Sequence, residues 1–239
     1  LQHVLDMRVS LAFTEDYLDT TGSFARYRRA TGWNLPEPGQ EAEGLAAFLY
    51  SLAKGNEPHG GNFRYLSPNT DLLGLVLERV SGKAYADLVS ELLWQPLGAG
   101  TDAVIAMDGH GAPRAAGGIC VTARDLLRLG HLILNGGAVG PTQIMSESWL
   151  ADMRRSGDPD AWANGDFAAA MGPGRYRNKW YQLGSDSRQI IAVGIHGQWL
   201  FVDPKTEVVI VKLSSQPQPL DEALDLQCLQ LYGQISQVA

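Results

Sequence analysis

The pattern of apolar and polar positions is clearest between residues 63 and 82. An extended approach that contains Tyr65 leads into Ser67-Pro68, and apolar residues then recur at helical spacing until Gly82. A serine oxygen can accept a free backbone N–H at the N-cap, and proline lacks the donor that would be unpaired at N1. The pattern therefore predicts a helix that begins after Ser67, with Tyr65 just outside its first turn.

Further helices follow from the same periodicity. Besides a short helix at the start of the chain, the expected helices cover residues 40–54, 85–94, 122–134, 146–154 and 220–238. Thr122 and Ser146 are the expected N-caps of two of them, because their hydroxyls can accept backbone N–H groups. The rest of residues 1–33 has aromatic and charged side chains without a clear period, which predicts a loop.

The last third of the chain changes to β-rich runs. Strands are expected at 190–197, 198–202 and 207–214, and residues 157–181 predict a loop with one strand. Helices first and strands last indicate an α+β fold, an antiparallel sheet flanked by helices. We expect one domain over residues 1–239, with a mostly helical lobe at 1–155 and the strands and last helix at 156–239.

Composition narrows the function classes. The 239 residues are 45% hydrophobic, the formal charge is −7, and the basic residues are scattered. These properties indicate neither nucleic acid nor an anionic membrane surface as a partner. No apolar run approaches the roughly 18 residues of a membrane span. Two cysteines predict no disulfide framework, and no metal or other cofactor is expected, because the five histidines and two cysteines lack ligand spacing. The compartment stays open, with the cytoplasm slightly favoured.

Two motifs carry a resemblance to a known superfamily. Tyr65-x-Ser67 with Leu73-Gly74, and the segment 115–126 with its Gly-Gly-x-x-x-Thr-x-x-Asp-Leu pattern, resemble serine hydrolases related to class C β-lactamases and penicillin-binding proteins. Serine at position 67, where most relatives have asparagine, is most similar to the branch of 6-aminohexanoate-dimer hydrolases and related esterases. The resemblance implies a β-lactamase-like fold and an acyl-enzyme mechanism.

Tyr65 is the catalytic candidate that this resemblance selects. The resemblance implies that Tyr65 acts first as a general base toward a seryl nucleophile and then as a general acid toward the leaving group. Its place at a helix start predicts a lowered cost for the phenolate, because free N–H groups and the helix dipole favour negative charge there. The alternative is a tyrosine that only packs in the core.

The third motif of the superfamily, Lys- or His-Thr-Gly, is expected in the first strand. Aligning its glycine with Gly194 puts Ala192 and Val193 where the cation and hydroxyl would be, and makes the backbone N–H of Ile195 an oxyanion donor. A second register makes His196 the cation. His196 can also be an ordinary polar residue of the strand.

The first motif, Ser-x-x-Lys, carries the nucleophile in these relatives, and we expect it in an N-terminal segment that precedes Leu1. Ser51-Leu-Ala-Lys54 has the same pattern. We interpret it as a coincidence, because the expected helix puts Lys54 in its last turn, where the dipole favours the charged amine and opposes a role as base.

The resemblance adds three substrate-binding candidates, Tyr17, Ser67 and Trp180. A loop residue such as Tyr17 can contact the substrate amide, and Trp180 can line a pocket; packed aromatics are the alternative for both. The expected function is hydrolysis of a small-molecule linear amide or ester, with a homodimer left open. A β-lactamase or D,D-peptidase is the alternative within the class. A ligand-binding pseudoenzyme is the alternative outside it.

Overall fold

The computed structural model describes residues 1–36, 38–184 and 189–238. These residues form two compact units, and each is considered by itself. Unit 1 comprises Leu1–Glu91 and Ala103–Cys120, and unit 2 comprises Leu92–Asp102 and Val121–Ala239. The division differs from the boundary expected near residue 155, because the helices after residue 121 pack with the sheet.

Unit 1 is helical, with one two-stranded ribbon. Its elements are α1 (Gln2–Leu5), α2 (Ser23–Ala30), α3 (Leu45–Ser51), α4 (Pro68–Ser81), α5 (Tyr85–Val89), β1 (Val104–Ile105) and β2 (Ile119–Cys120). A π-helical turn, η1 (Ser90–Trp94), continues α5 and runs from unit 1 into unit 2. The predicted helix after Ser67 is confirmed, with Pro68 at N1 and Gly82 in the left-handed conformation at its end (φ +69°).

Helix α2 lies where the sequence predicts only loop. It is eight residues long, and its buried side chains, among them Phe24, Tyr27 and Ala30, recur every three residues between exposed or half-buried arginines. So short an amphipathic pattern is hard to separate from noise. Phe24 and Tyr27 pack in an aromatic cluster with Phe13 and Phe48. Tertiary packing of this face therefore stabilises the helix.

The Ser51-x-x-Lys54 segment does not have the geometry of a nucleophile and its base. Helix α3 is shorter than the expected range 40–54, and Lys54 lies beyond it in a β-bridge with Leu11, so its predicted place in a last helical turn is wrong. The Ser51 hydroxyl donates to the Phe48 carbonyl oxygen at 2.7 Å. Ser51 and Lys54 therefore do not share a helix face, which supports the interpretation of this motif as a coincidence.

Unit 2 is built around a five-stranded antiparallel sheet of order β5-β6-β7-β8-β9. Its elements are α6 (Ala123–Leu134), β3 (Ala138–Val139), β4 (Thr142–Gln143), α7 (Glu147–Arg155), α8 (Pro159–Ala163), α9 (Ala168–Met171), β5 (Gly174–Arg177), β6 (Trp180–Leu183), β7 (Gln189–Gly194), β8 (Gln198–Asp203), β9 (Val208–Lys212) and α10 (Glu222–Val238). The α+β fold and the antiparallel sheet are confirmed. The region 157–181, predicted as loop with one strand, contains α8, α9 and β5, and β6 begins within it.

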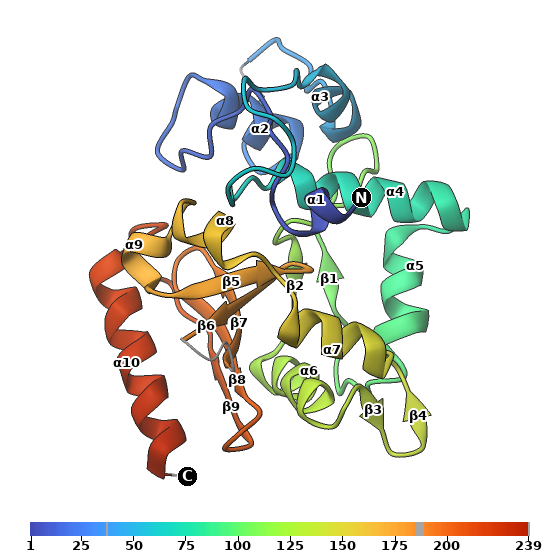
Figure 1. Ribbon diagram of the computed structural model, residues 1–239. Coiled ribbons are helices and arrows are strands. Elements are labelled where there is room, and N and C mark those ends of the chain that lie inside the picture. The colour runs from blue at the N-terminus through green and yellow to red at the C-terminus, as the bar shows by residue number, and fades with distance from the viewer. Residues whose placement is uncertain (37, 185–188, 239) are drawn as a thin grey trace. The chain divides into compact units, whose positions relative to one another are not determined.

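Strand β8 is buried on both faces. Its Leu200 and Val202 belong to a cluster with Ile133 of α6 and residues of α7. On the other face, Trp199 and Phe201 contact Tyr232 of α10, with ring centroids 5.8 and 5.6 Å apart. Alternation along the strand thus places the sheet between α10 on one side and α6 with α7 on the other (Figure 1).

The Thr and Asp of the Gly-Gly-x-x-x-Thr-x-x-Asp-Leu segment form a cap. Thr122 Oγ1 accepts the Asp125 N–H at 3.2 Å, as predicted for an N-cap. The Asp125 carboxylate in turn accepts from Gly100 N at 2.7 Å and from Thr101 Oγ1 at 2.6 Å. These two residues therefore join the start of α6 to the 100–101 turn.

We expect the Asp125 cap to make unit 2 sensitive to acid. Hydrogen bonds from Thr101 above all, then Gly100 and Thr122, hold the pKa of Asp125 well below its usual range. A lowered folded-state pKa contributes stability that is present above the unfolded value of about 4 and is lost as the pH falls through the folded value. Asp125→Asn should therefore unfold at a lower temperature at neutral pH, and the difference from wild type should shrink on acidification. Asp102→Asn, at an exposed carboxylate, is the matched control; an unchanged Asp125→Asn melting curve would contradict the cap.

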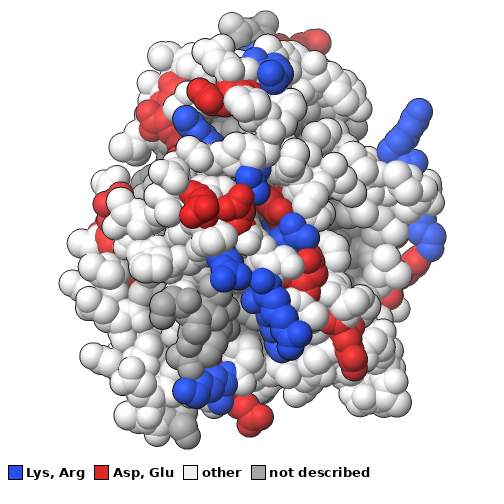
Figure 2. Space-filling model, viewed as in Figure 1, with Lys and Arg blue, Asp and Glu red and all other residues white. Residues whose placement is uncertain are grey.

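Surface charge follows the composition. On the face drawn in Figure 2, lysine and arginine side chains lie beside aspartate and glutamate side chains. Within the described part of the chain, every helix is too short or too polar to cross a bilayer.

Candidate active site

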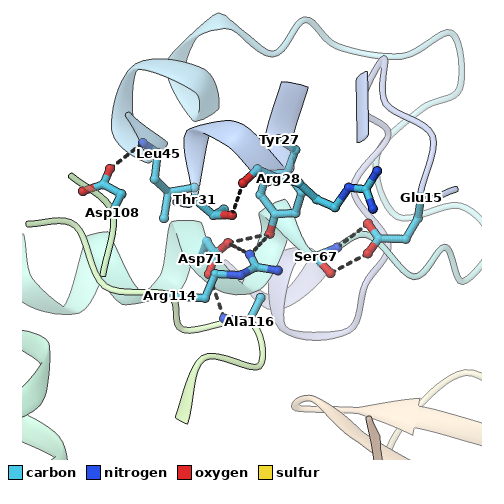
Figure 3. Close-up of polar contacts among 10 residues, drawn as sticks. All are labelled: Glu15, Tyr27, Arg28, Thr31, Leu45, Ser67, Asp71, Asp108, Arg114 and Ala116. Carbon is cyan, nitrogen blue, oxygen red and sulfur yellow. Dashed lines mark hydrogen bonds and ion pairs between the residues drawn. The ribbon is translucent and has the colours of Figure 1, made fainter. Parts of the chain in front are cut away.

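The segment that enters α4 is held by a carboxylate that sequence reasoning did not identify. The Ser67 hydroxyl donates to Glu15 Oε1 at 2.5 Å, and the Ser67 N–H donates to Glu15 Oε2 at 2.9 Å (Figure 3). The Ser67 side chain therefore does not cap the helix, and the predicted capping bond is wrong. Ser67 is 6% exposed and gives its hydroxyl proton to Glu15, so it links the segment to Glu15; a contact with substrate stays a prediction.

Tyr65 is half-buried two residues before this link. Burial, reinforced by the negative charge of Glu15, raises the pKa of Tyr65 to about 12; Arg114 opposes this and Asp71 adds to it. The prediction that the helix start lowers the cost of the phenolate is wrong, because desolvation and Glu15 outweigh the dipole. At neutral pH Tyr65 is a phenol with a proton to give.

Tyr17 lies in the same environment. Its ring packs edge-on against Phe24 at 5.0 Å between centroids, and its hydroxyl forms a hydrogen bond with Glu15. Burial, then Glu15 and then Tyr65 raise the pKa of Tyr17. The structure thus brings three predicted residues, Tyr17, Tyr65 and Ser67, to one carboxylate.

A buried ion pair lies close enough to Tyr65 to affect its pKa. Asp71, fully buried on α4, accepts from Tyr27 Oη and Arg114 Nη1, each at 2.5 Å, and from Ala116 N at 2.7 Å (Figure 3). Arg114 also donates to the Tyr27 hydroxyl and lies over the Tyr27 ring at 4.7 Å. Burial disfavours the guanidinium, but its contacts with Tyr27 and Asp71 raise the pKa of Arg114; on the other side of the pair, burial raises the pKa of Asp71 and Arg114 opposes this.

The two sequence motifs meet at this ion pair. Asp71 and Gly74 follow Tyr65, while Ala116 and its neighbour Ala115 open the second motif. A Cβ at Gly74 would lie 2.9 Å from the Ala115 side chain, so glycine is needed for α4 to approach this loop. Sequence reasoning found both motifs and missed the contact between them. The available signal was the charged pair itself, an aspartate inside an apolar helix and an arginine just before the second motif.

Unit 2 holds the remaining candidates. Gly194 ends β7, and Ile195, His196 and Gly197 form the turn to β8. Within the described residues, no hydrogen-bond acceptor is recorded for the Ile195 N–H, as an oxyanion donor requires.

His196 lies in this turn and not on the strand as predicted, with φ +58°. Its N–H donates to Pro219 O at 3.0 Å, and its Nδ1 lies 2.7 Å from Gln216 O. These contacts tie the turn to the 216–219 segment. They give His196 a structural role, and its part as the cation of the alternative register stays a prediction.

Trp180 begins β6 and packs against the cluster that contains Ile133 and Leu200. This contact corresponds to the packing alternative, and a pocket wall stays a prediction. Across the described residues, no three His, Cys, Asp or Glu side chains gather as metal ligands would.

Comparison with known proteins assigns this architecture. The family model described as Beta-lactamase matches residues 1–231. The 6-aminohexanoate-dimer hydrolase of Paenarthrobacter ureafaciens is 38% identical over 216 residues, which cover 90% of this chain and 54% of the relative. The chain thus spans about half the length of that curated relative.

Solved structures agree with this assignment. A Bacillus anthracis protein, provisionally named a 6-aminohexanoate-dimer hydrolase, superimposes with a TM-score of 0.84 at 25% identity, over 99% of this chain and 60% of that one. The D-amino acid amidase of Ochrobactrum anthropi SV3 shares the fold with a TM-score of 0.64 at 13% identity, over 97% and 76% of the two chains. The resemblance that Tyr65, Ser67 and the 115–126 segment indicate is therefore confirmed: the chain belongs to the beta-lactamase family.

Proposed function

We propose that the complete gene product is a serine hydrolase that cleaves linear amide or ester bonds through an acyl-enzyme. The observation that carries this proposal is Tyr65, a half-buried phenol with a raised pKa beside Glu15, in a chain of the beta-lactamase family. The printed name of the Paenarthrobacter relative supports an amide substrate.

Tyr65 has two proton transfers in this proposal. As the seryl oxygen bonds to the substrate carbonyl carbon, the seryl proton passes to the pair formed by Tyr65 and the predicted lysine. The Tyr65 hydroxyl then gives its proton to the leaving nitrogen or oxygen as the C–N or C–O bond breaks, and water releases the acyl group by the reverse sequence. A pKa of about 12 suits the donor step directly. The base step needs Tyr65 as a phenolate, and a cation such as that lysine would stabilise its negative charge.

The Ile195 N–H is the proposed oxyanion donor. Its two chain neighbours fix its position, because Gly194 pairs with Gln198 across the hairpin and His196 is bonded to the 216–219 segment. A donor held in this way needs little reorganisation when charge develops on the substrate oxygen. The second donor in the proposal is the backbone N–H of the nucleophilic serine.

The proposed substrates are linear and carry no carboxylate at the third-motif position. Ala192 and Val193 occupy strand β7 opposite Leu200 and Trp199, and neither can bind an anion. The ammonium group of Lys212 near this hairpin donates to Gly197 O at 3.0 Å. A carboxylate bound at Ala192 and Val193 would lose its charge-assisted contacts and its hydration.

A comparison of kcat/KM between linear substrates and a β-lactam tests this proposal. A lost contact of about 3 kcal/mol corresponds to roughly a hundredfold in kcat/KM. We therefore expect the complete gene product to hydrolyse p-nitrophenyl butyrate and the linear 6-aminohexanoate dimer with a kcat/KM at least about a hundredfold above that for nitrocefin. Labelling by a fluorophosphonate probe establishes the active serine independently of the substrate. A preference for nitrocefin would favour a β-lactamase, and a protein that neither labels nor turns over would be a binding protein.

A further inference from the structure

Glu15 lies on the inner side of the loop formed by residues 11–20, which turns at Tyr17 and Leu18. From Leu11 to Thr20 the side chains alternate between half-buried and exposed, and the inner positions include Phe13, Glu15 and Tyr17. Phe13 and Tyr17 pack on the aromatic cluster of α2 and α3. The alternation thus places an acidic side chain between two anchored aromatic residues, facing the start of α4.

The Glu15 carboxylate has three donors, and all of them belong to predicted site residues or their backbone. Ser67 supplies its hydroxyl at 2.5 Å and its N–H at 2.9 Å, and Tyr17 supplies its phenolic hydroxyl. A bidentate contact to one serine fixes both the backbone and the side chain of that residue. Tyr65 is two residues earlier, so this contact restrains the backbone that directly follows it.

We propose that Glu15 is a positioning residue: its carboxylate holds Tyr17 directly and holds the segment that carries Tyr65 through Ser67. This inference rests on the proposed function. It adds a residue that neither the motifs nor the comparisons assign, and it predicts two separable effects, one of geometry and one of charge.

The charge effect is the shift that nearby charges cause in the pKa of Tyr65. Within the described residues, the charges that act on the pKa of Tyr65 are those of Glu15 in the 11–20 segment, Arg114 in the loop before β2 and Asp71 on α4, and the neutral phenol of Tyr17 lies in the same environment. Burial is the largest cause of the raised pKa of Tyr65, and Glu15 comes next. Because a phenolate next to a carboxylate is disfavoured, removing the Glu15 charge should lower the pKa of Tyr65 toward its ordinary value of about 10.

The charge effect is measured without turnover. Wild type, Glu15→Gln, Tyr65→Phe and the double variant are jumped to about pH 11, and tyrosinate absorbance is read within milliseconds, before unfolding. We expect Glu15→Gln to ionise more tyrosine than wild type, and part of this excess to disappear in the Tyr65→Phe background. Asp16→Asn removes an exposed charge from the adjacent position and should behave as wild type. If Glu15→Gln causes no excess, or an excess of the same size with and without Tyr65, the inference is overturned.

The geometric effect is measured by turnover of the complete gene product on p-nitrophenyl butyrate. Glu15→Gln should lower kcat roughly tenfold or more and move the alkaline limb of the kcat profile to lower pH, because Tyr65 must keep its proton for the leaving group. Ser67→Ala keeps the Glu15 charge and should lower kcat without moving that limb.

The same data separate the two proposals. An inactive, unlabelled wild type would refute the proposed function, while the pH-jump result would still decide whether Glu15 sets the pKa of Tyr65. An active wild type whose Glu15→Gln and Ser67→Ala variants keep its kcat and alkaline limb would refute the role of Glu15 alone. If Glu15→Gln does not fold, unchanged kcat in Ser67→Ala still refutes the positioning role.

Discussion

Replacing Tyr65 with phenylalanine is expected to lower kcat of the complete gene product by roughly 10²–10⁴-fold, the usual contribution of a positioned acid–base group. The change in KM should be smaller, because the hydroxyl acts on the proton in the transition state and the ring that packs is retained. Steady-state kinetics on p-nitrophenyl butyrate and on a linear amide test this. The loss should be larger for the amide, whose leaving nitrogen depends more on protonation.

A matched control separates this chemistry from packing. Tyr85 is also a half-buried tyrosine of unit 1 with a pKa raised by burial, and it lies outside the group around Glu15. Tyr85→Phe should keep kcat close to wild type. Thermal unfolding of both variants shows whether either substitution disturbs the fold. Wild-type turnover in Tyr65→Phe would return Tyr65 to the role of a core residue.

The predictable part of this fold is the part with a long period or a strong cap. Helices α4, α6 and α7 begin where Ser67, Thr122 and Ser146 predict, and the β8–β9 hairpin turns at the expected residues. The eight-residue α2, the short α8 and α9, and one of the two four-residue strands β5 and β6 were not predicted. In such short elements the local pattern is weak, and tertiary packing decides the conformation.

The candidate site also has residues that the sequence predicts and one that it does not. Tyr65, Ser67 and Gly194-Ile195 could be found from motifs, because these are local in sequence. Glu15 could not, because it is 52 residues from Ser67 and no local pattern marks the contact. The predicted direction of the Tyr65 pKa shift was wrong for the same reason, because the shift depends on burial and on Glu15 and not on the helix start alone.

Breaking the buried ion pair between Arg114 and Asp71 should have the largest effect on stability. Arg114→Met keeps much of the side-chain volume but leaves the fully buried Asp71 carboxylate without its cation. Breaking one partner of a buried pair costs about 3–5 kcal/mol, a large share of the roughly 5–15 kcal/mol of a typical domain. Urea unfolding should show a correspondingly lower midpoint. Arg26→Met, which removes an exposed pair with Glu43, should cost at most about 1 kcal/mol.

A second substitution tests whether the uncompensated charge causes this loss. In Arg114→Met, Asp71 keeps the burial that raises its pKa and loses the guanidinium that lowers it. A folded-state pKa above the unfolded value gives stability that is present at low pH and lost as the pH rises through the folded value. The deficit of Arg114→Met should therefore shrink between about pH 7 and pH 5. Adding Asp71→Asn, which removes the charge, should make the double variant less unstable than the sum of the two single changes. Strict additivity and a deficit independent of pH would show that Arg114 stabilises unit 1 by packing on Tyr27 alone.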